Sequence, residues 1–293
     1  MRLDGRRQST NVEDRRGAGG RVGKASIGIG GLIIAGLVTW LLGGNPLDVL
    51  KNGGGALMPG VTTTQTEEYV PTAEEEQAAV FVKQILAGTE DVWTKVFADN
   101  GLSYVPPKMV LFTGSVQSGC GGASAETGPF YCPADQCVYI DLSFFNVMRQ
   151  RLGADGDFAF AYVVAHEVGH HVQNLLGTLD KAHAQMARLS QADANAVNVR
   201  VELQADYYAG VWAHYDNAMF SSIEPGDIEE GINAAHQIGD DKLQMEAQGY
   251  VVPDAFNHGT SAQRMAWLYK GYTEGTLSGG DTFNLPDPSV PKY

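Results

Sequence analysis

His166-Glu167-Val168-Gly169-His170 lies within residues 158–176, an apolar stretch that has no proline and only one formally charged residue, Glu167. Residues four apart share one face of a helix, so His166 and His170 can direct a ring nitrogen to the same metal ion. Glu167 stands beside them, where it can take a proton from metal-bound water. A buried carboxylate needs a partner that offsets its desolvation. The stretch therefore predicts a buried helix that binds zinc.

Two histidines do not complete a zinc site, because a catalytic zinc ion takes three protein ligands and keeps a fourth position open. Glu202 and Asp206 follow the motif and are again four residues apart. We expect Glu202 to be the third ligand and Asp206 to accept a hydrogen bond from a ligand histidine, which fixes the tautomer of that ring. The alternative third ligands are the other histidines of the chain: His171, His183, His214, His236 and His258.

The extended zinc motif of the metzincins is not present. Gln173 and Leu176 occupy the positions at which that motif requires glycine and histidine. His171 directly follows His170 and is turned about 100° away around the helix, so we expect it to point elsewhere. The pattern therefore predicts a His-His-Glu site of the gluzincin type.

The order of secondary structure predicts the fold class. Helices are expected at residues 71–87 and 90–100, with a break at Gly88, and the β-branched and aromatic residues 137–142 predict a strand. The chain beyond them is mostly helical and includes the motif helix at residues 157–176. A small sheet followed by helices is the order of an α+β protein. We expect a mainly helical, zincin-like metalloprotease domain with a small β-sheet, preceded by one N-terminal transmembrane helix.

The N-terminal region differs in composition from the rest. Residues 1–24 hold seven basic and three acidic side chains, whereas residues 25–42 are uncharged and would span roughly 27 Å as a helix. Because basic residues precede this apolar stretch and no small-residue cleavage site follows it, we expect a transmembrane helix rather than a signal peptide. The expected domains are a basic cytoplasmic tail (1–24), the transmembrane helix (25–42), a flexible linker (43–70) and a zinc metallopeptidase domain (71–293).

The net charge of the chain is −14, and the basic N-terminal residues make the remainder still more acidic. An acidic surface repels nucleic-acid phosphates, so no nucleic-acid partner is expected. The length of 293 residues, of which 44% are hydrophobic, allows a large core. Composition does not decide between an enzyme and a binding protein.

Three cysteines, Cys120, Cys132 and Cys137, lie within a span of 18 residues. Outside the cytoplasm one pair can oxidise, and one thiol is then left over. From the residues alone, Cys120 with Cys132 and Cys132 with Cys137 are both possible pairs. A zinc site made of cysteines is disfavoured, because four soft ligands are not available in this region.

These features resemble the predicted neutral zinc metallopeptidases of bacteria, which are typically membrane-anchored. The resemblance covers nearly the whole chain and rests on blocks outside HExxH as well: Gly5-Arg6-Arg7, Asn11-Val12-Glu13-Asp14-Arg15-Arg16, Gly128-Pro129-Phe130-Tyr131-Cys132-Pro133, Val138-Tyr139-Ile140-Asp141-Leu142, Glu202-Leu203-Gln204-Ala205-Asp206 and Gly239-Asp240-Asp241. It implies peptidase activity, zinc (Zn2+) as the cofactor, and a disulfide between Cys120 and Cys132. Members of that family usually have no cysteine at position 137, so the resemblance implies no role for Cys137.

A wider similarity relates the chain to the membrane CAAX proteases and their bacterial heat-shock relatives. In those enzymes a late histidine, with an arginine six positions on, lies near the substrate and the metal. His258 and Arg264 have this spacing. The similarity implies that His258 stabilises the oxyanion or acts as a fourth ligand, and that Arg264 orients the substrate.

The expected function is that of a zinc metalloendopeptidase, in which Glu167 assists the attack of zinc-bound water on a peptide bond. Residues 138–142 are expected to pair with an extended peptide or protein substrate if they form a sheet edge. Tyr207 and Tyr208 are further candidate oxyanion donors. The alternative is a zinc-stabilised, membrane-tethered interaction module without catalysis. The expected location is the bacterial inner or plasma membrane, with a single-pass anchor, a cytoplasmic N-terminus and an extracytoplasmic catalytic domain.

Overall fold

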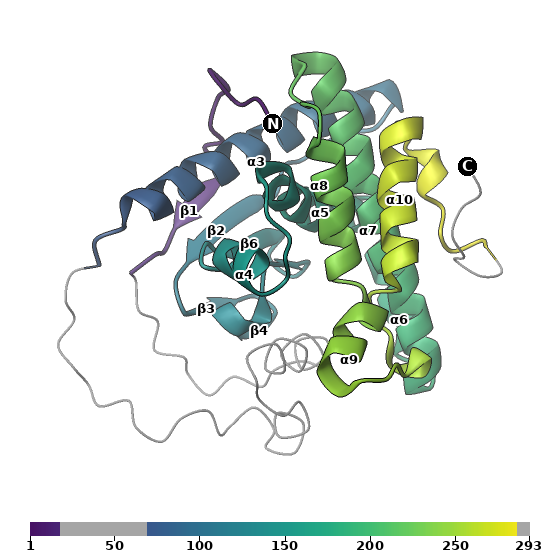
Figure 1. Ribbon diagram of the computed structural model, residues 1–293. Helices are drawn as coiled ribbons and strands as arrows, with labels where there is room; N and C mark the ends of the chain where they lie inside the picture. The colour runs from purple at the N-terminus through teal and green to yellow at the C-terminus, as the bar shows by residue number, and fades with distance from the viewer. Residues whose placement is uncertain (18–68, 286–293) are drawn as a thin grey trace, which may run out of the picture. The chain divides into compact units, whose positions relative to one another are not determined.

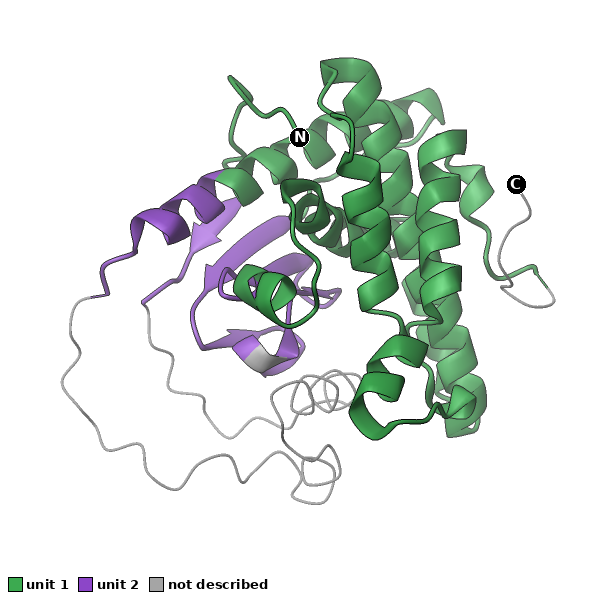
Figure 2. Cartoon of the chain, viewed as in Figure 1, with its two compact units in different colours: residues 1–10, 81–107, 145–293 green, residues 11–80, 108–144 purple. Residues whose placement is uncertain are grey.

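The computed structural model describes residues 1–17 and 69–285, which form two compact units (Figure 2). The described residues of unit 1 fall within 1–10, 81–107 and 145–293, and those of unit 2 within 11–80 and 108–144. The expected transmembrane helix and nearly all of the expected linker lie outside the described residues.

Unit 2 contains a four-stranded mixed sheet. Its strands lie in the order β1 (Val12–Asp14), β2 (Lys108–Phe112), β6 (Cys137–Asp141) and β5 (Phe130–Cys132). β2 is parallel to both β1 and β6, whereas β5 is antiparallel to β6. The strand expected at residues 137–142 is therefore present, but it is paired on both sides. The expected pairing with an extended substrate required a free sheet edge, and residues 137–139 have none, because β2 and β5 pair with them on the two sides.

A second, two-stranded sheet and a disulfide complete unit 2. β3 (Ser115–Ser118) and β4 (Gly121–Ser124) form a hairpin, which is followed by the 3-10 helix η1 (Ala125–Thr127). Cys120 is bonded to Cys132, which confirms the implied disulfide. Cys137 keeps a free thiol in the apolar cluster around Val110 and Tyr139. Burial raises the pKa of this thiol, so Cys137 is a packing residue rather than a nucleophile.

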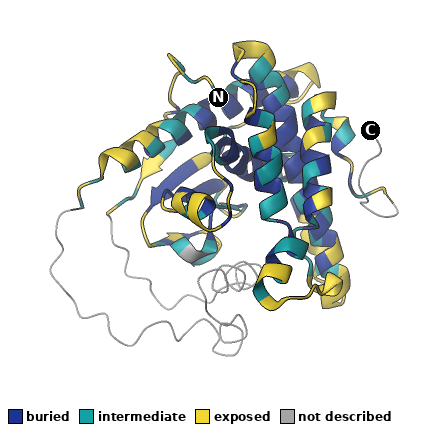
Figure 3. Ribbon diagram, in the orientation of Figure 1, coloured by how far each residue is buried: buried dark blue, intermediate teal, exposed yellow. Residues whose placement is uncertain are grey.

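Unit 1 is built of helices. α7 (Gln191–Phe220), α8 (Asp227–Gln237) and α10 (Ser261–Glu274) lie side by side (Figure 1), and α5 (Asp157–Leu175) packs against α7 and α8. A Cβ on Gly210 or Gly271 would collide with the backbone of the facing helix, so these glycines let α7 and α10 approach closely. α5 and α7 are buried along most of their length (Figure 3). The shorter helices are α4 (Phe144–Gln150), α6 (Thr178–Met186), α9 (Asp240–Gln248), η2 (Pro253–Ala255) and η3 (Ser278–Gly280).

α3 (Ala73–Asp99) is one continuous helix, where the sequence predicted two. Gly88 does not end a helix. A Cβ at this position would lie 2.8 Å from Arg6 Nη2 and 2.8 Å from Asp216 Oδ1. Only glycine leaves room for the Arg6–Asp216 ion pair against the helix backbone. This packing offsets the lower helix propensity of glycine.

Residues 1–17 belong to the folded protein. In unit 1, Arg6 forms an ion pair of 2.7 Å with Asp216 of α7, and the Ser9 hydroxyl donates to Glu90 of α3 at 2.5 Å. In unit 2, residues 12–14 form β1 at one edge of the sheet. Basic side chains that the sequence assigned to a separate tail thus neutralise acidic side chains of the fold.

The expected fold class needs one correction. The structure is mainly helical with small sheets, which agrees with the α+β prediction. Among residues 1–17 and 69–285, however, no helix is long and apolar enough to cross a membrane. The transmembrane helix was assigned to residues 25–42, outside the described residues, from the apolar stretch and its flanking sequence. It is therefore removed from the fold class.

Candidate metal centre

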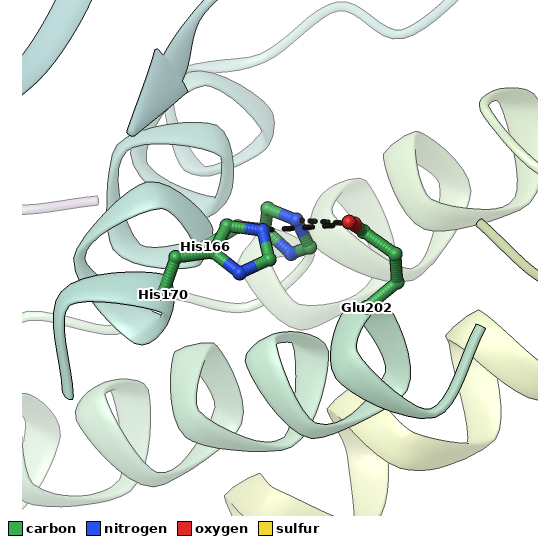
Figure 4. Close-up of side chains that lie close together, drawn as sticks. All are labelled: His166, His170 and Glu202. Carbon is green, nitrogen blue, oxygen red and sulfur yellow. Dashed lines mark hydrogen bonds and ion pairs between the residues drawn. The ribbon is translucent and has the colours of Figure 1, made fainter. Parts of the chain in front are cut away.

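The glycine of the motif brings the two halves of the centre together. A Cβ on Gly169 of α5 would lie 2.9 Å from the carbonyl oxygen of Ala205 and 3.2 Å from its Cα. Only glycine therefore allows α5 and α7 to cross so closely at this point. The close crossing brings Glu202 of α7 to the imidazoles of His166 and His170 (Figure 4).

Three potential ligand atoms converge between these helices. Glu202 Oε2 lies 3.2 Å from His166 Nε2 and 3.6 Å from His170 Nε2. Ligand atoms bound tetrahedrally to zinc at about 2.0–2.1 Å are themselves roughly 3.3 Å apart. The structure thus brings together His166, His170 and Glu202, which could hold a metal ion, and their donor set suits zinc.

Asp206 fixes the orientation of the first histidine. His166 Nδ1 donates to Asp206 Oδ1 at 2.8 Å, which leaves Nε2 directed at Glu202. The same carboxylate accepts from the Tyr162 hydroxyl at 2.6 Å and from Arg264 Nε and Nη2 at 2.9 and 3.0 Å. Asp206 is 0% exposed, and these donors satisfy both of its oxygens. Its predicted role as the partner of a ligand histidine agrees with this geometry.

Gln173 orients the second histidine, a contact that the sequence analysis missed. His170 Nδ1 lies 2.9 Å from Gln173 Oε1, and Gln173 Nε2 donates to the carbonyl of Val201 and to Gln204 Oε1. The amide therefore accepts the proton of Nδ1 and leaves Nε2 for a metal. The signal was present in the sequence, because Gln173 follows His170 by three residues on the same helix.

The charges of the centre favour a bound cation. Burial opposes ionisation of Glu202, but His170 and His166 outweigh it and hold the pKa of the carboxyl well below its usual range. Burial likewise opposes a charge on His166, but Asp206 and Glu202 raise the pKa of the imidazole to about 10. The same carboxylates that stabilise a proton on this ring would stabilise a metal ion, which must displace that proton to bind.

Glu167 interacts electrostatically with His166, His170 and Glu202 but is not one of the three potential metal ligands. Its side chain is buried, and burial raises the pKa of the carboxyl, although His170 and His166 partly offset the rise. A carboxyl with a raised pKa can both accept and return a proton near neutral pH. This is the property that the motif assigns to the glutamate.

His258 lies beside the centre on a loop held by Asp240. Asp240 Oδ2 accepts the backbone N–H groups of Asn257, His258 and Gly259 at 2.6–2.9 Å, and His258 Nδ1 lies 3.2 Å from Asp240 Oδ1. Burial lowers the pKa of His258, but Asp240 and then Glu202 raise it above its usual value overall. The carboxylate of Asp240, to which the sequence analysis gave no role, thus both positions this imidazole and favours its charged form.

Arg264 was expected to orient the substrate, and the structure shows its guanidinium paired within the fold. This residue is 3% exposed, and its guanidinium contacts Asp206, the Tyr162 hydroxyl and the carbonyl of Ile238. Its charge pairs with the buried carboxylate of Asp206, and the substrate-orienting role stays a prediction. Arg264 acts on the centre through Asp206 and His166.

The rival histidines do not join His166 and His170. His171 and His214 bond to the backbone carbonyls of Val105 and Tyr272. His183 is exposed on α6 and His236 lies on α8, and neither belongs to a candidate ligand group among the described residues. Of the tyrosines considered as oxyanion donors, Tyr207 directs its hydroxyl to the carbonyl of Thr276 at 2.8 Å.

A second group of acidic side chains also lies within reach of one cation: Asp157, Asp227 and Glu230. The amino group of Met1 lies 2.7 Å from Asp157 Oδ2 and 3.2 Å from Asp227 Oδ1. A cationic group of the chain itself therefore already contacts two of these three side chains, and we assign no metal to them.

The fold and the His-His-Glu geometry define a mainly helical protein with a gluzincin-like metal centre. The chain belongs to the family described as "Putative neutral zinc metallopeptidase", whose model matches residues 1–283. This family membership implies zinc as the metal.

Relatives with similar sequences span much of the chain. The Escherichia coli K12 protein named "Uncharacterized protein YpfJ" is 46% identical over 290 residues, which cover 97% of this chain and 99% of that protein. The Mycobacterium tuberculosis H37Rv protein named "Uncharacterized protein Rv2575" is 44% identical over 194 residues, which cover 63% and 64% of the two chains. No solved structure gives a significant match. The names of these relatives record no activity.

Proposed function

We propose that the chain is a zinc metallopeptidase that hydrolyses peptide bonds. The observation that carries this proposal is the convergence of His166 Nε2, His170 Nε2 and Glu202 Oε2, with the buried carboxyl of Glu167 beside them. A zinc site that serves only structure is closed by four protein ligands and has no need of a base. The three ligands and the adjacent carboxyl are instead the components of a hydrolytic site.

In this proposal the residues divide the work of hydrolysis. Zinc, when bound by His166, His170 and Glu202, would act as a Lewis acid that lowers the pKa of water and polarises the scissile carbonyl. Glu167 accepts a proton from the attacking water and donates it to the leaving amine. Asp206 and Gln173 hold the ligand imidazoles in the tautomers that leave Nε2 free.

His258 is proposed to donate a hydrogen bond to the oxyanion that develops on the scissile carbonyl. The Asp240 contact holds its ring and favours the cationic form, which is the better donor. We expect His258→Ala to lower kcat by about 10²–10³-fold with a small change in KM and unchanged zinc content. Kinetics on a quenched fluorescent peptide would test this role. Loss of zinc from the variant would identify His258 as a ligand instead.

Metal content and cleavage of an unfolded protein such as casein test the proposed function. We expect one zinc ion per chain, loss of cleavage on chelation, and recovery on addition of zinc. Glu202→Ala removes the only anionic ligand of the three and should weaken zinc retention by at least about 10–100-fold. Failure of the wild-type chain to bind zinc would contradict the proposal. Bound zinc without cleavage would favour the alternative, a zinc-stabilised interaction module.

We also propose that the protein acts on peptide or protein substrates outside the cytoplasm. The disulfide between Cys120 and Cys132 supports an oxidising compartment, since such bonds are rare where thiols are kept reduced. The acidic character of the chain supports neutral or basic peptides over acidic ones as substrates, and it argues against nucleic acid.

A further inference from the structure

The first ten residues are built into unit 1, the unit that holds the metal centre. Arg6 donates to the two carboxylate oxygens of Asp216 at 2.7 and 3.2 Å, and its guanidinium lies 3.7 Å from the centre of the Phe220 ring. Asp216 is 0% exposed. Removing one partner of a buried pair is strongly destabilising, because the other charge is left uncompensated. The fold of α7 therefore depends on Arg6.

Backbone contacts tie the same segment down along its length. Arg2 N donates to the carbonyl of Ser222 at 2.7 Å, and Ser9 N donates to the carbonyl of Lys83 at 2.9 Å. The side chain of Gln84 donates to the carbonyl oxygen of Leu3 at 3.1 Å. Residues 1–10 thus contact both α7 and α3 within unit 1, as an integral part rather than an appended tail.

Within unit 2, the described residues on the two sides of the 18–68 stretch lie close together. Gly17 and Tyr69 flank residues 18–68, and a Cβ on Gly17 would collide with the Cβ of Tyr69. Next to this contact, Arg16 Nη2 lies 2.8 Å from Glu76 Oε1 of α3. The residues on either side of the undescribed stretch are therefore neighbours in the fold.

We infer that residues 1–10 and the metal centre, which belong to one folded unit, lie on the same side of any membrane. A single crossing by residues 25–42 would place Arg6 and Asp216 on opposite sides of a bilayer. A second crossing would need another apolar stretch of similar length, and the sequence of residues 43–68 contains none. The sequence led us to expect a cytoplasmic N-terminus and an extracytoplasmic catalytic domain. The inference replaces that topology.

Labelling of two introduced cysteines tests this inference in cells that produce the full chain. Gln8→Cys and Ala184→Cys occupy exposed positions of unit 1, one in the N-terminal segment and one on α6. The native cysteines give little background, because two form the disulfide and Cys137 is buried. A membrane-impermeant maleimide should treat both positions alike, labelling both in intact spheroplasts or both only after lysis. Labelling of one position and protection of the other would overturn the inference.

The ion pair gives an independent test in the purified full chain. We expect Arg6→Ala to lower the thermal midpoint by roughly 10 °C or more. The matched control is Arg2→Ala, since the Arg2 side chain is 60% exposed and lies 3.5 Å from Glu224. That variant should change the midpoint little. Equally small shifts in both variants would mean that Arg6 does not reach Asp216 in the native chain, which would also overturn the inference.

Discussion

Glu167→Gln is expected to abolish most cleavage of casein while the protein keeps its zinc. The substitution preserves the shape of the side chain but removes the group that accepts and returns the proton, a function worth about 10²–10⁴-fold in rate. Zinc should remain, because the converging ligand atoms belong to His166, His170 and Glu202, and Glu167 is not among these residues. Zinc content and initial rates of casein cleavage would be measured on the same preparations.

Glu229→Gln is the matched control for this experiment. Glu229 is an exposed glutamate of α8, so the same chemical change there should leave both zinc and cleavage unchanged. If Glu167→Gln cleaves as fast as the wild type, another group acts as the base. If the wild type and Glu167→Gln both bind zinc and neither cleaves casein, the interaction module becomes the better account of the centre.

The converging ligands could be predicted from the sequence because they depend on local geometry. His166 and His170 share a helix face at a spacing of four, and so do Glu202 and Asp206. A helix fixes such pairs whatever packs against it. The sequence did not show directly that the helix face of His166 and His170 meets that of Glu202. It could be inferred because HExxH supplies only two ligands and a zinc site needs a third. Gly169 also belongs to that signal, since its missing side chain allows α5 to meet α7.

The residues that support the ligands could be predicted only in part. The local contact of Gln173 with His170 was recoverable from spacing, but Gln173 was considered only as a departure from the metzincin pattern. Asp240 and Arg264 lie on other helices, and their partners depend on how α9 and α10 pack in unit 1. The similarity to the membrane CAAX proteases implied that Arg264 was near the centre, but a similarity could not give the direction of its side chain.

The N-terminal residues were misinterpreted because their partners are distant in sequence. The block that contains Arg6 reads as a basic tail when its neighbours are considered alone. Its counter-charge, Asp216, lies more than two hundred residues away. β1 has only three residues, too few for strand periodicity to be visible. Gly88 was the one local trace of this arrangement, and as a glycine between two helical stretches it indicated a helix end instead.

Arg264→Ala is expected to destabilise the fold by about 3–5 kcal/mol, because it leaves the carboxylate of Asp206 buried without its cation. Asp206 would lose the bonds from Arg264 Nε and Nη2, and Tyr162 would lose its contact with Nη2. The exposed Arg188 offers a matched control, and Arg188→Ala should stay within about 0.5 kcal/mol of the wild type. Urea unfolding would measure both variants.

The conditions of that measurement decide what it reports. Burial raises the pKa of Asp206, but Arg264 and His166 outweigh it and hold the pKa at about 2, below the ordinary 3.8. A folded-state pKa below the unfolded one contributes stability that is complete above about pH 4 and is lost as the pH falls towards 2, so unfolding should be followed near neutral pH. Bound zinc stabilises the folded state separately, so the variants should be compared with chelator first and then with zinc. A variant that is as stable as the wild type in chelator, but has a raised KM for casein, would show that Arg264 contacts substrate after all.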